Sequence, residues 1–409
     1  MIFFIVVLML ISSFLLRPSS FGQEYTNIAL ILLAAAFVLY LMRIGFKKQK
    51  IRFTKKNIVI FVVFTIFWLY ILVQGITLSV EKIDWVIKAV IAHLSSMFIF
   101  FILLSDPKVN KFYFKGLIII LLLNSLSYIL TIVLILFGFD MNELYFLRTY
   151  VDTDIYYQFT HYGRVLFPFT QIYGRVFINN LEIPRALGFF REAGIYQMFL
   201  IFSIFNSNRY FKKHLKLINS ILIIGVMSTF STAGLVLLVV IFALKLFMEK
   251  KYSPSFATIV FSFIAFLFAP IVGFQDKSNT SVQSFDDRIN SFYEGIDLLI
   301  KNPFGVGLYN AIDSTNRNLG IHLIGMSSMI GIIGLILILL VYFLPIVNYN
   351  NKKLYIISIA PFFLTLLTSQ PILDAPLVYV MFLCNFAVNY VNDSNKMDEI
   401  YSKAYFTLI

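Results

Sequence analysis

The sequence predicts an all-α integral membrane protein of about twelve transmembrane helices with two long external loops. Hydrophobic residues make up 59% of the 409 residues, charged residues only 13%, and mean hydropathy is +0.85, far from the values of a soluble domain. The apolar residues fall in runs of about 16 to 24, long enough to cross hydrocarbon as helices. These runs lack the strict alternation of membrane-barrel strands, so we expect helices.

Basic residues predict the orientation of the spans. Residues 43–56 carry seven basic groups and no acidic group, and residues 105–115, 206–216, 248–253 and 349–353 repeat the pattern more weakly. By the positive-inside rule these segments face the cytoplasm. Pairs of apolar runs separate them, which predicts a multi-pass protein with both termini in the cytoplasm. This distribution of the net charge of +12 argues against a nucleic-acid partner.

Two apolar runs need comment. Residues 1–16 have no basic segment before them and no small-residue cleavage site after them, which predicts a retained helix and not a signal peptide. Residues 217–248 read as one run, yet cytoplasmic signals flank both ends. We therefore expect this run to cross and return, turning near residues 228–234. Each leg is then short for a span, a feature tolerated where backbone is buried in protein or lines a cavity.

The predicted topology divides the chain into five parts. They are N-terminal transmembrane helices (1–139), an external loop (140–187), central transmembrane helices (188–273), a second external loop (274–320) and C-terminal transmembrane helices (321–409). In the second loop, apolar residues between 286 and 302 recur at helical spacing, which predicts an amphipathic helix on the outer surface or roofing a cavity. This uneven distribution of loops favours chemistry at the outer face.

Arginine replaces lysine in and after the first external loop. No lysine occurs between Lys115 and Lys212, whereas Arg148, Arg164 and Arg175 lie in the loop together with six tyrosines and five phenylalanines. A guanidinium binds phosphate oxygens in two-pronged fashion and stacks on rings, and an ammonium group does not. The alternative is an interfacial belt of aromatic residues with arginines extending to lipid headgroups.

Charges also stand at the head of the next apolar run. Arg185, Gly188 and Glu192 fall at helical spacing on one face, with Arg191 beside them. Gly188 would leave room between the charges for a substrate or a neighbouring helix. Because charge within a bilayer is costly, such residues generally have partners and a purpose. The alternative is an ion pair between Arg185 and Glu192 that only anchors the end of a helix.

Four stretches carry a resemblance to a known family. The sequence R-A-L-G-F-F-R-E-A-G at residues 185–194 is followed by a serine-rich turn (228–235), by an arginine with a downstream N-P-x-G-x-G (288–308) and by a G-x-x-G helix (329–339). Together they resemble the Wzy-type polymerases of O-antigen and capsular polysaccharide and the related O-antigen ligases. Ala193 replaces the usual proline, so we expect the helix to run unbroken there.

The resemblance implies an enzyme of the bacterial cytoplasmic membrane. It would join oligosaccharide repeat units carried on polyprenyl pyrophosphate at the outer face, with the pyrophosphate lipid as leaving group. Such glycosyl transfer needs no metal and no cofactor. The expected partners are the lipid-linked oligosaccharide and membrane lipid, with a flippase and a chain-length regulator as further candidates.

The resemblance and the residue types together give candidate site residues. Cations would stabilise the leaving pyrophosphate, a base would accept the proton of the acceptor hydroxyl, and aromatic rings would stack on sugars. The candidate bases are Glu192 and His322. The candidate substrate-binding residues are Arg164, Arg175, Arg185 and Arg191, with Arg288 in reserve, together with Gly188, Tyr157 and Tyr162.

Two other functions share these features. An O-antigen ligase would carry the same stretches and use a different acceptor. A lipid-linked oligosaccharide flippase would share the hydropathy but would be a transporter; we expect matched halves for it, and the sequence has no internal repeat.

Overall fold

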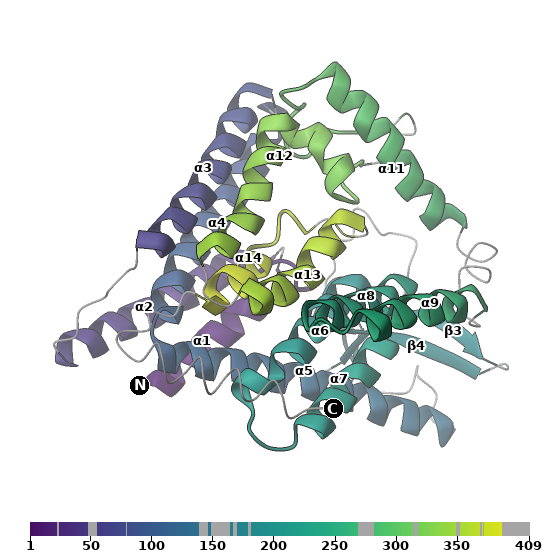
Figure 1. Ribbon diagram of the computed structural model, residues 1–409. Helices are drawn as coiled ribbons and strands as arrows, with labels where there is room; N and C mark the ends of the chain where they lie inside the picture. Colours follow the sequence, from purple (N-terminus) through teal and green to yellow (C-terminus); the bar gives the residue numbers. More distant parts are fainter. Residues whose placement is uncertain are drawn as a thin grey trace.

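The computed structural model shows a helical bundle with a small sheet at one side (Figure 1). The structure describes most of the chain. The described residues are 1–22, 24–47, 55–78, 80–138, 146–148, 164–166, 170–178, 181–268, 282–312, 314, 318–348, 352–368, 370 and 372–386.

Helices make up most of the described chain. They are α1 (Ile2–Phe14), α2 (Thr26–Lys47), α3 (Lys55–Leu78), α4 (Ile83–Leu104), α5 (Pro107–Leu136), α6 (Ala193–Tyr210), α7 (Leu215–Met227), α8 (Thr232–Met248), α9 (Tyr252–Phe268), α11 (Val282–Lys301), α12 (Leu323–Asn348), α13 (Lys352–Thr368) and α14 (Pro376–Leu383). Short 3-10 helices cover Val80–Lys82 and Cys384–Phe386.

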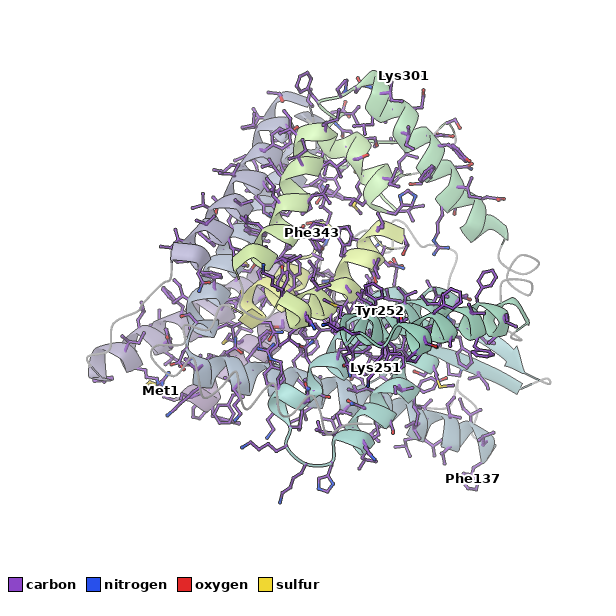
Figure 2. All side chains as sticks on the ribbon, viewed as in Figure 1. Met1, Phe137, Lys251, Tyr252, Lys301 and Phe343 are labelled. Atoms are coloured by element: carbon purple, nitrogen blue, oxygen red, sulfur yellow. The ribbon has the colours of Figure 1, made fainter. Side chains whose placement is uncertain are left out.

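Five of the described helices are long and apolar enough to cross a membrane. They are Thr26–Phe46, Asn57–Leu78, Ile83–Leu104, Pro107–Leu136 and Leu323–Ile346. Their outer faces carry exposed apolar side chains, as expected where lipid replaces water as the neighbour, and Figure 2 shows such side chains projecting outward, with Phe137 at the far end of α5. The expected multi-pass helical protein is confirmed at this level; the number of twelve spans stays a prediction.

The expected interruption within residues 217–248 is present. Helix α7 has 13 residues and α8 has 17, and residues 228–231 between them are not helical. Both helices are shorter than a full crossing at 1.5 Å per residue requires. The serine-rich turn is therefore a break inside an apolar run, as the flanking lysines indicated.

Residues 140–187, expected to form the first external loop, contain a β-sheet that was not predicted. Strands β1 (Phe146–Arg148), β2 (Arg164–Leu166), β3 (Thr170–Ile178) and β4 (Leu181–Gly188) form an antiparallel sheet in the order β1-β2-β3-β4. Strand β4 leads directly to the head of α6 (Figure 1). The all-α expectation therefore holds for the apolar runs but not for this loop.

Two sequence predictions about residues 185–194 are wrong. Arg185 and Gly188 lie on β4, so they share no helical face with Glu192. Helix α6 begins at Ala193 and does not run unbroken through it. The physical reason is that β4 pairs with β3 over most of its length, and this strand pairing overrides the helical spacing of the charges.

Helix α12 is broken at Gly331. The residue has φ +68° and ψ 178° inside an otherwise helical segment, a conformation that a residue with a side chain rarely adopts. The break pairs with the preceding glycine turn: Val306 N donates to Ser328 O (3.0 Å) and Ile332 N donates to Pro303 O (2.8 Å). The N-P-x-G-x-G stretch and the G-x-x-G helix thus meet backbone to backbone.

Side chains of α3 complete this junction. Tyr70 Oη donates to Ile330 O (3.0 Å), and Gln74 Nε2 donates to the carbonyls of Phe304 and Ile330. These are carbonyl groups that the helix break exposes, and inside a membrane the protein itself must satisfy them.

We predict that Gly331→Ala strongly destabilises the protein. A residue with a Cβ atom at this φ costs roughly 1–2 kcal/mol, and that atom would lie 2.3 Å from the carbonyl carbon of Phe304. Gly45→Ala is the matched control, because a Cβ atom on this helical glycine meets nothing within 4 Å. Thermal unfolding of detergent-purified protein should show a large loss for Gly331→Ala and no loss for Gly45→Ala. Equal melting temperatures would contradict the junction.

Two sets of connections come together at different places. Backbone hydrogen bonds join one set, which belongs to the connections expected outside: residues 17–20, 186–191, 228 and 377. Among the basic connections expected inside, Lys353 Nζ donates to Met248 O (2.8 Å) and Arg43 Nη1 donates to Asp106 Oδ2 (2.9 Å). This grouping agrees with the alternation of the predicted topology.

Thiol labelling tests which set faces outward. In a Cys384→Ala background, we predict that Glu81→Cys reacts with a membrane-impermeant thiol reagent in intact cells, and that Lys213→Cys reacts only after permeabilisation. Both positions are exposed, and Cys384 is the only cysteine of the chain. The reverse pattern would invert the orientation, and labelling of both in intact cells would refute the alternation.

Candidate functional site

The head of α6 presents two of the predicted charges. Arg191 and Glu192 lie between the end of β4 and Ala193, and Arg191 Nε is 3.9 Å from Glu192 Oε1. About a third of each side chain is exposed (33% and 32%). Glu192 occupies the N-cap position, but its carboxylate caps no backbone amide of α6. The carboxylate therefore remains available to other groups beside the positive end of the helix dipole.

The backbone on either side of these charges is clamped by residues 18–20. Arg191 N donates to Pro18 O (3.2 Å), and Ser20 N donates to Phe189 O (3.0 Å). The ring of Phe190 is buried and stacks on Phe199 with centroids 4.4 Å apart. These contacts anchor the segment before α6, so the positions of Arg191 and Glu192 do not depend on their own side chains.

Gly188 serves packing within the chain. It has φ +58°, and a Cβ atom there would lie 2.6 Å from the ring of Tyr196 and 3.0 Å from Asn124 Nδ2. The sequence analysis expected this glycine to leave room for a substrate or a neighbouring helix. The space is filled by side chains of α5 and α6 of the same chain.

Arg185 holds the break between α7 and α8. Its Nε donates to Thr229 O (2.9 Å), while the next residue, Ala186, donates from its backbone N to Ser228 O (2.9 Å). Two carbonyls of the serine-rich turn are thereby bound by the end of β4. The turn and the head of α6, 36 or more residues apart in the sequence, are thus parts of one structure.

Helix α11 brings a third charge to Glu192. Burial lowers the pKa of the Arg288 guanidinium, and the negative charges of Glu192 and Asp287 raise it. Arg288 is thus near enough to Glu192 for their charges to interact, although 96 residues separate them. Glu192 therefore has the guanidinium of Arg191 at 3.9 Å and lies within electrostatic range of the guanidinium of Arg288.

His322, the other candidate base, is bound through both ring nitrogens. Gly325 N donates to Nδ1 (3.1 Å), and Nε2 lies 3.1 Å from the carbonyl oxygen of Arg288. Because Nδ1 accepts, we assign the proton to Nε2, which then donates to that carbonyl. His322 caps the start of α12 and ties α12 to α11. This geometry favours a positioning role over that of a base.

A second charged group lies beside the first and was missed by the sequence analysis. Arg17 forms an ion pair with Asp374, and Tyr309 Oη donates to Asp374 Oδ2 (2.6 Å). Burial and the charge of Asp374 raise the pKa of the Tyr309 phenol well above its usual range, so the phenol stays a donor. Single charges at the ends of apolar runs resemble helix anchors, and no sequence signal connects Arg17 with Asp374.

The remaining predicted residues lie on or beyond the sheet. Arg164 is on β2 and Arg175 is on β3, where only the backbone is described. Tyr157 and Tyr162 lie outside the described residues. Within the described ranges, no group of three or more histidine, cysteine, aspartate and glutamate side chains could hold a metal ion.

Comparisons with protein-family models, curated proteins and solved structures gave no match. Two observations therefore bear on the function: the residues of the site, and the resemblance of four sequence stretches to Wzy-type polymerases.

The role of His322 is open to a stability test. We predict that His322→Ala lowers stability by about 0.5–2 kcal/mol, because the cap of α12 and the tether to Arg288 are lost. His322→Asn keeps an N-cap acceptor and should recover part of this loss in thermal unfolding. Unchanged melting of both variants, with loss of activity, would instead assign the ring to chemistry.

Proposed function

We propose that this protein is a metal-independent glycosyltransferase that polymerises oligosaccharide repeat units linked to polyprenyl pyrophosphate, at the outer face of the bacterial cytoplasmic membrane. The observation that carries the proposal is the pair Arg191 and Glu192 at the head of α6, with Arg288 of α11 within electrostatic range of Glu192. These residues belong to connections expected outside. Residues 185–194 contain Arg191 and Glu192, residues 288–308 contain Arg288, and the serine-rich turn at 228–235 is hydrogen-bonded to Ala186; all three stretches resemble Wzy-type polymerases.

The chemistry assigns separate tasks to these charges. The acceptor hydroxyl oxygen bonds to the anomeric carbon of the donor sugar, the bond from that carbon to the pyrophosphate oxygen breaks, and the electron pair leaves with the pyrophosphate lipid. Negative charge grows on the leaving group, and guanidinium groups stabilise it with paired hydrogen bonds. Arg191 and Arg288 would serve this task, with Arg185 holding the adjacent turn.

The proton of the acceptor hydroxyl needs a base. Glu192 is partly exposed and caps no amide of its helix, whereas both ring nitrogens of His322 are engaged by the backbone. We therefore assign the base to Glu192. Proton transfer to a positioned carboxylate typically contributes about 10²–10⁴-fold to a rate.

The proposed roles of Arg191 and Glu192 can be tested in cells. We predict that Arg191→Lys and Glu192→Gln leave membrane abundance normal and reduce the surface polysaccharide to single repeat units, with activity lower by about 10²-fold or more. Arg43→Lys, in the Arg43–Asp106 pair among the basic connections, is the matched control. Its polysaccharide should keep the normal length.

Other outcomes separate the alternatives. Chains of normal length in Arg191→Lys and Glu192→Gln would overturn the proposed roles, and low abundance with normal-length chains would mark the two residues as anchors of α6. Deletion of the gene distinguishes the activities: single exported repeat units indicate a polymerase, absence of export indicates a flippase, and full-length polymer that is not joined to its final acceptor indicates a ligase.

A further inference from the structure

Trp85 is an exposed aromatic residue beside the Arg17–Asp374 pair. The chain has two tryptophans: Trp68 is fully buried, stacked on His93, and Trp85, at the start of α4, is 53% exposed. Trp85 meets the ring of Tyr309 in a T-shaped contact, with centroids 6.0 Å apart and planes at 69°. This contact and the high exposure leave a face of the indole accessible.

Tyr309 joins this ring to the charged group. Its hydroxyl donates to Asp374 Oδ2, which also receives the Arg17 guanidinium. Its backbone has φ +72°, a rare conformation for a bulky residue, and its carbonyl accepts a hydrogen bond from Lys82 Nζ (2.7 Å). Strain of this kind persists where surrounding contacts fix the residue, and it is frequent at functional sites.

Two charged side chains of the group are partly exposed. The Arg17 side chain is 28% exposed and that of Asp374 is 14% exposed. An accessible ring face next to a carboxylate, a phenol and a guanidinium suits a sugar, whose apolar face packs on an aromatic ring while its hydroxyl groups donate to carboxylate and accept from cationic donors. The carboxylate disfavours a pyrophosphate, since like charges repel.

This group adjoins the head of α6. Pro18, next to Arg17, accepts a backbone hydrogen bond from Arg191, and Arg17 O accepts one from Leu377 N (3.3 Å). The aromatic and charged residues around Asp374 are therefore connected through one peptide unit to the proposed catalytic charges. A saccharide several rings long could span both.

We propose that Trp85, Tyr309, Asp374 and Arg17 form a carbohydrate subsite that binds a neutral sugar ring of the oligosaccharide repeat unit. The inference rests on the proposed function, because the oligosaccharide repeat unit is the substrate of that function. Trp85 provides the stacking face, Asp374 accepts from sugar hydroxyl groups, and Tyr309 and Arg17 hold the carboxylate in place.

The two tryptophans make a direct binding test possible. In a Trp68→Phe background, Trp85 is the only tryptophan, so its fluorescence reports the subsite. The probe is the mixture of oligosaccharides obtained by partial acid hydrolysis of the producing cell's own surface polysaccharide, added to detergent-purified protein. We expect a saturable change in Trp85 emission. Asp374→Asn and Tyr309→Phe, which keep side-chain size, should each weaken binding at least about tenfold.

Chain length in cells provides the second measurement. Trp85→Ala should shorten the polysaccharide at normal membrane abundance, and Phe137→Ala, which removes another exposed aromatic ring (78% exposed), should not. If Trp85 emission responds to the oligosaccharides neither in the Trp68→Phe protein nor in its Asp374→Asn variant, the proposed subsite is wrong. Low abundance of Trp85→Ala with normal-length chains would also overturn the subsite, because that marks an interfacial anchor.

The subsite and the proposed function fail separately. Loss of polymer in Arg191→Lys without any oligosaccharide binding at Trp85 would leave the polymerase and remove the subsite. Saturable binding that Asp374→Asn weakens, together with normal polymer in Arg191→Lys, would support the subsite and remove the proposed assignment of the catalytic charges.

Discussion

Backbone that leaves its helix inside a membrane protein must find hydrogen-bond partners within the chain, and this constraint organises the structure. The described chain has a strand-to-helix turn before α6, a break after α7 and a break within α12. The carbonyl of Pro18 and the amide of Ser20 close the first. The amide of Ala186 and the guanidinium of Arg185 close the second, and the glycine turn after α11 closes the third with help from Gln74 of α3. The first two of these segments therefore bind one another, and Arg191 and Glu192 lie on the first.

The sequence predicted the features that depend on local composition. Apolar runs and lysine-rich connections predicted a helical membrane protein, flanking lysines predicted the break between α7 and α8, and helical spacing predicted α11. The sheet escaped prediction because the spacing of Arg185, Gly188 and Glu192 resembles a helical face. The short hairpin that β3 and β4 form across residues 179–180 decides the conformation instead.

The same distinction holds for the site. Arg191, Glu192 and Arg288 were predicted individually from residue type and from resemblance, and the fold brings them together. Arg17 and Asp374 are 357 positions apart, so nothing in either neighbourhood indicates the other. The role of His322 could not be read from its identity, because only the backbone contacts at both ring nitrogens distinguish a helix cap from a base.

The glycine junction has a mechanical consequence for the site. Helix α11 and the first turns of α12 are fastened together by His322 and by the close approach of Gly295 to Gly325, while Gly331 separates them from the rest of α12. At this separation Gly305 and Gly331 face one another, and a Cβ atom on either glycine would lie 2.3 Å from backbone of the opposite segment. Arg288 lies on α11 and Glu192 lies before α6, so the close approach of the two glycine segments, by fixing where α11 sits, also fixes how far apart these two charges are.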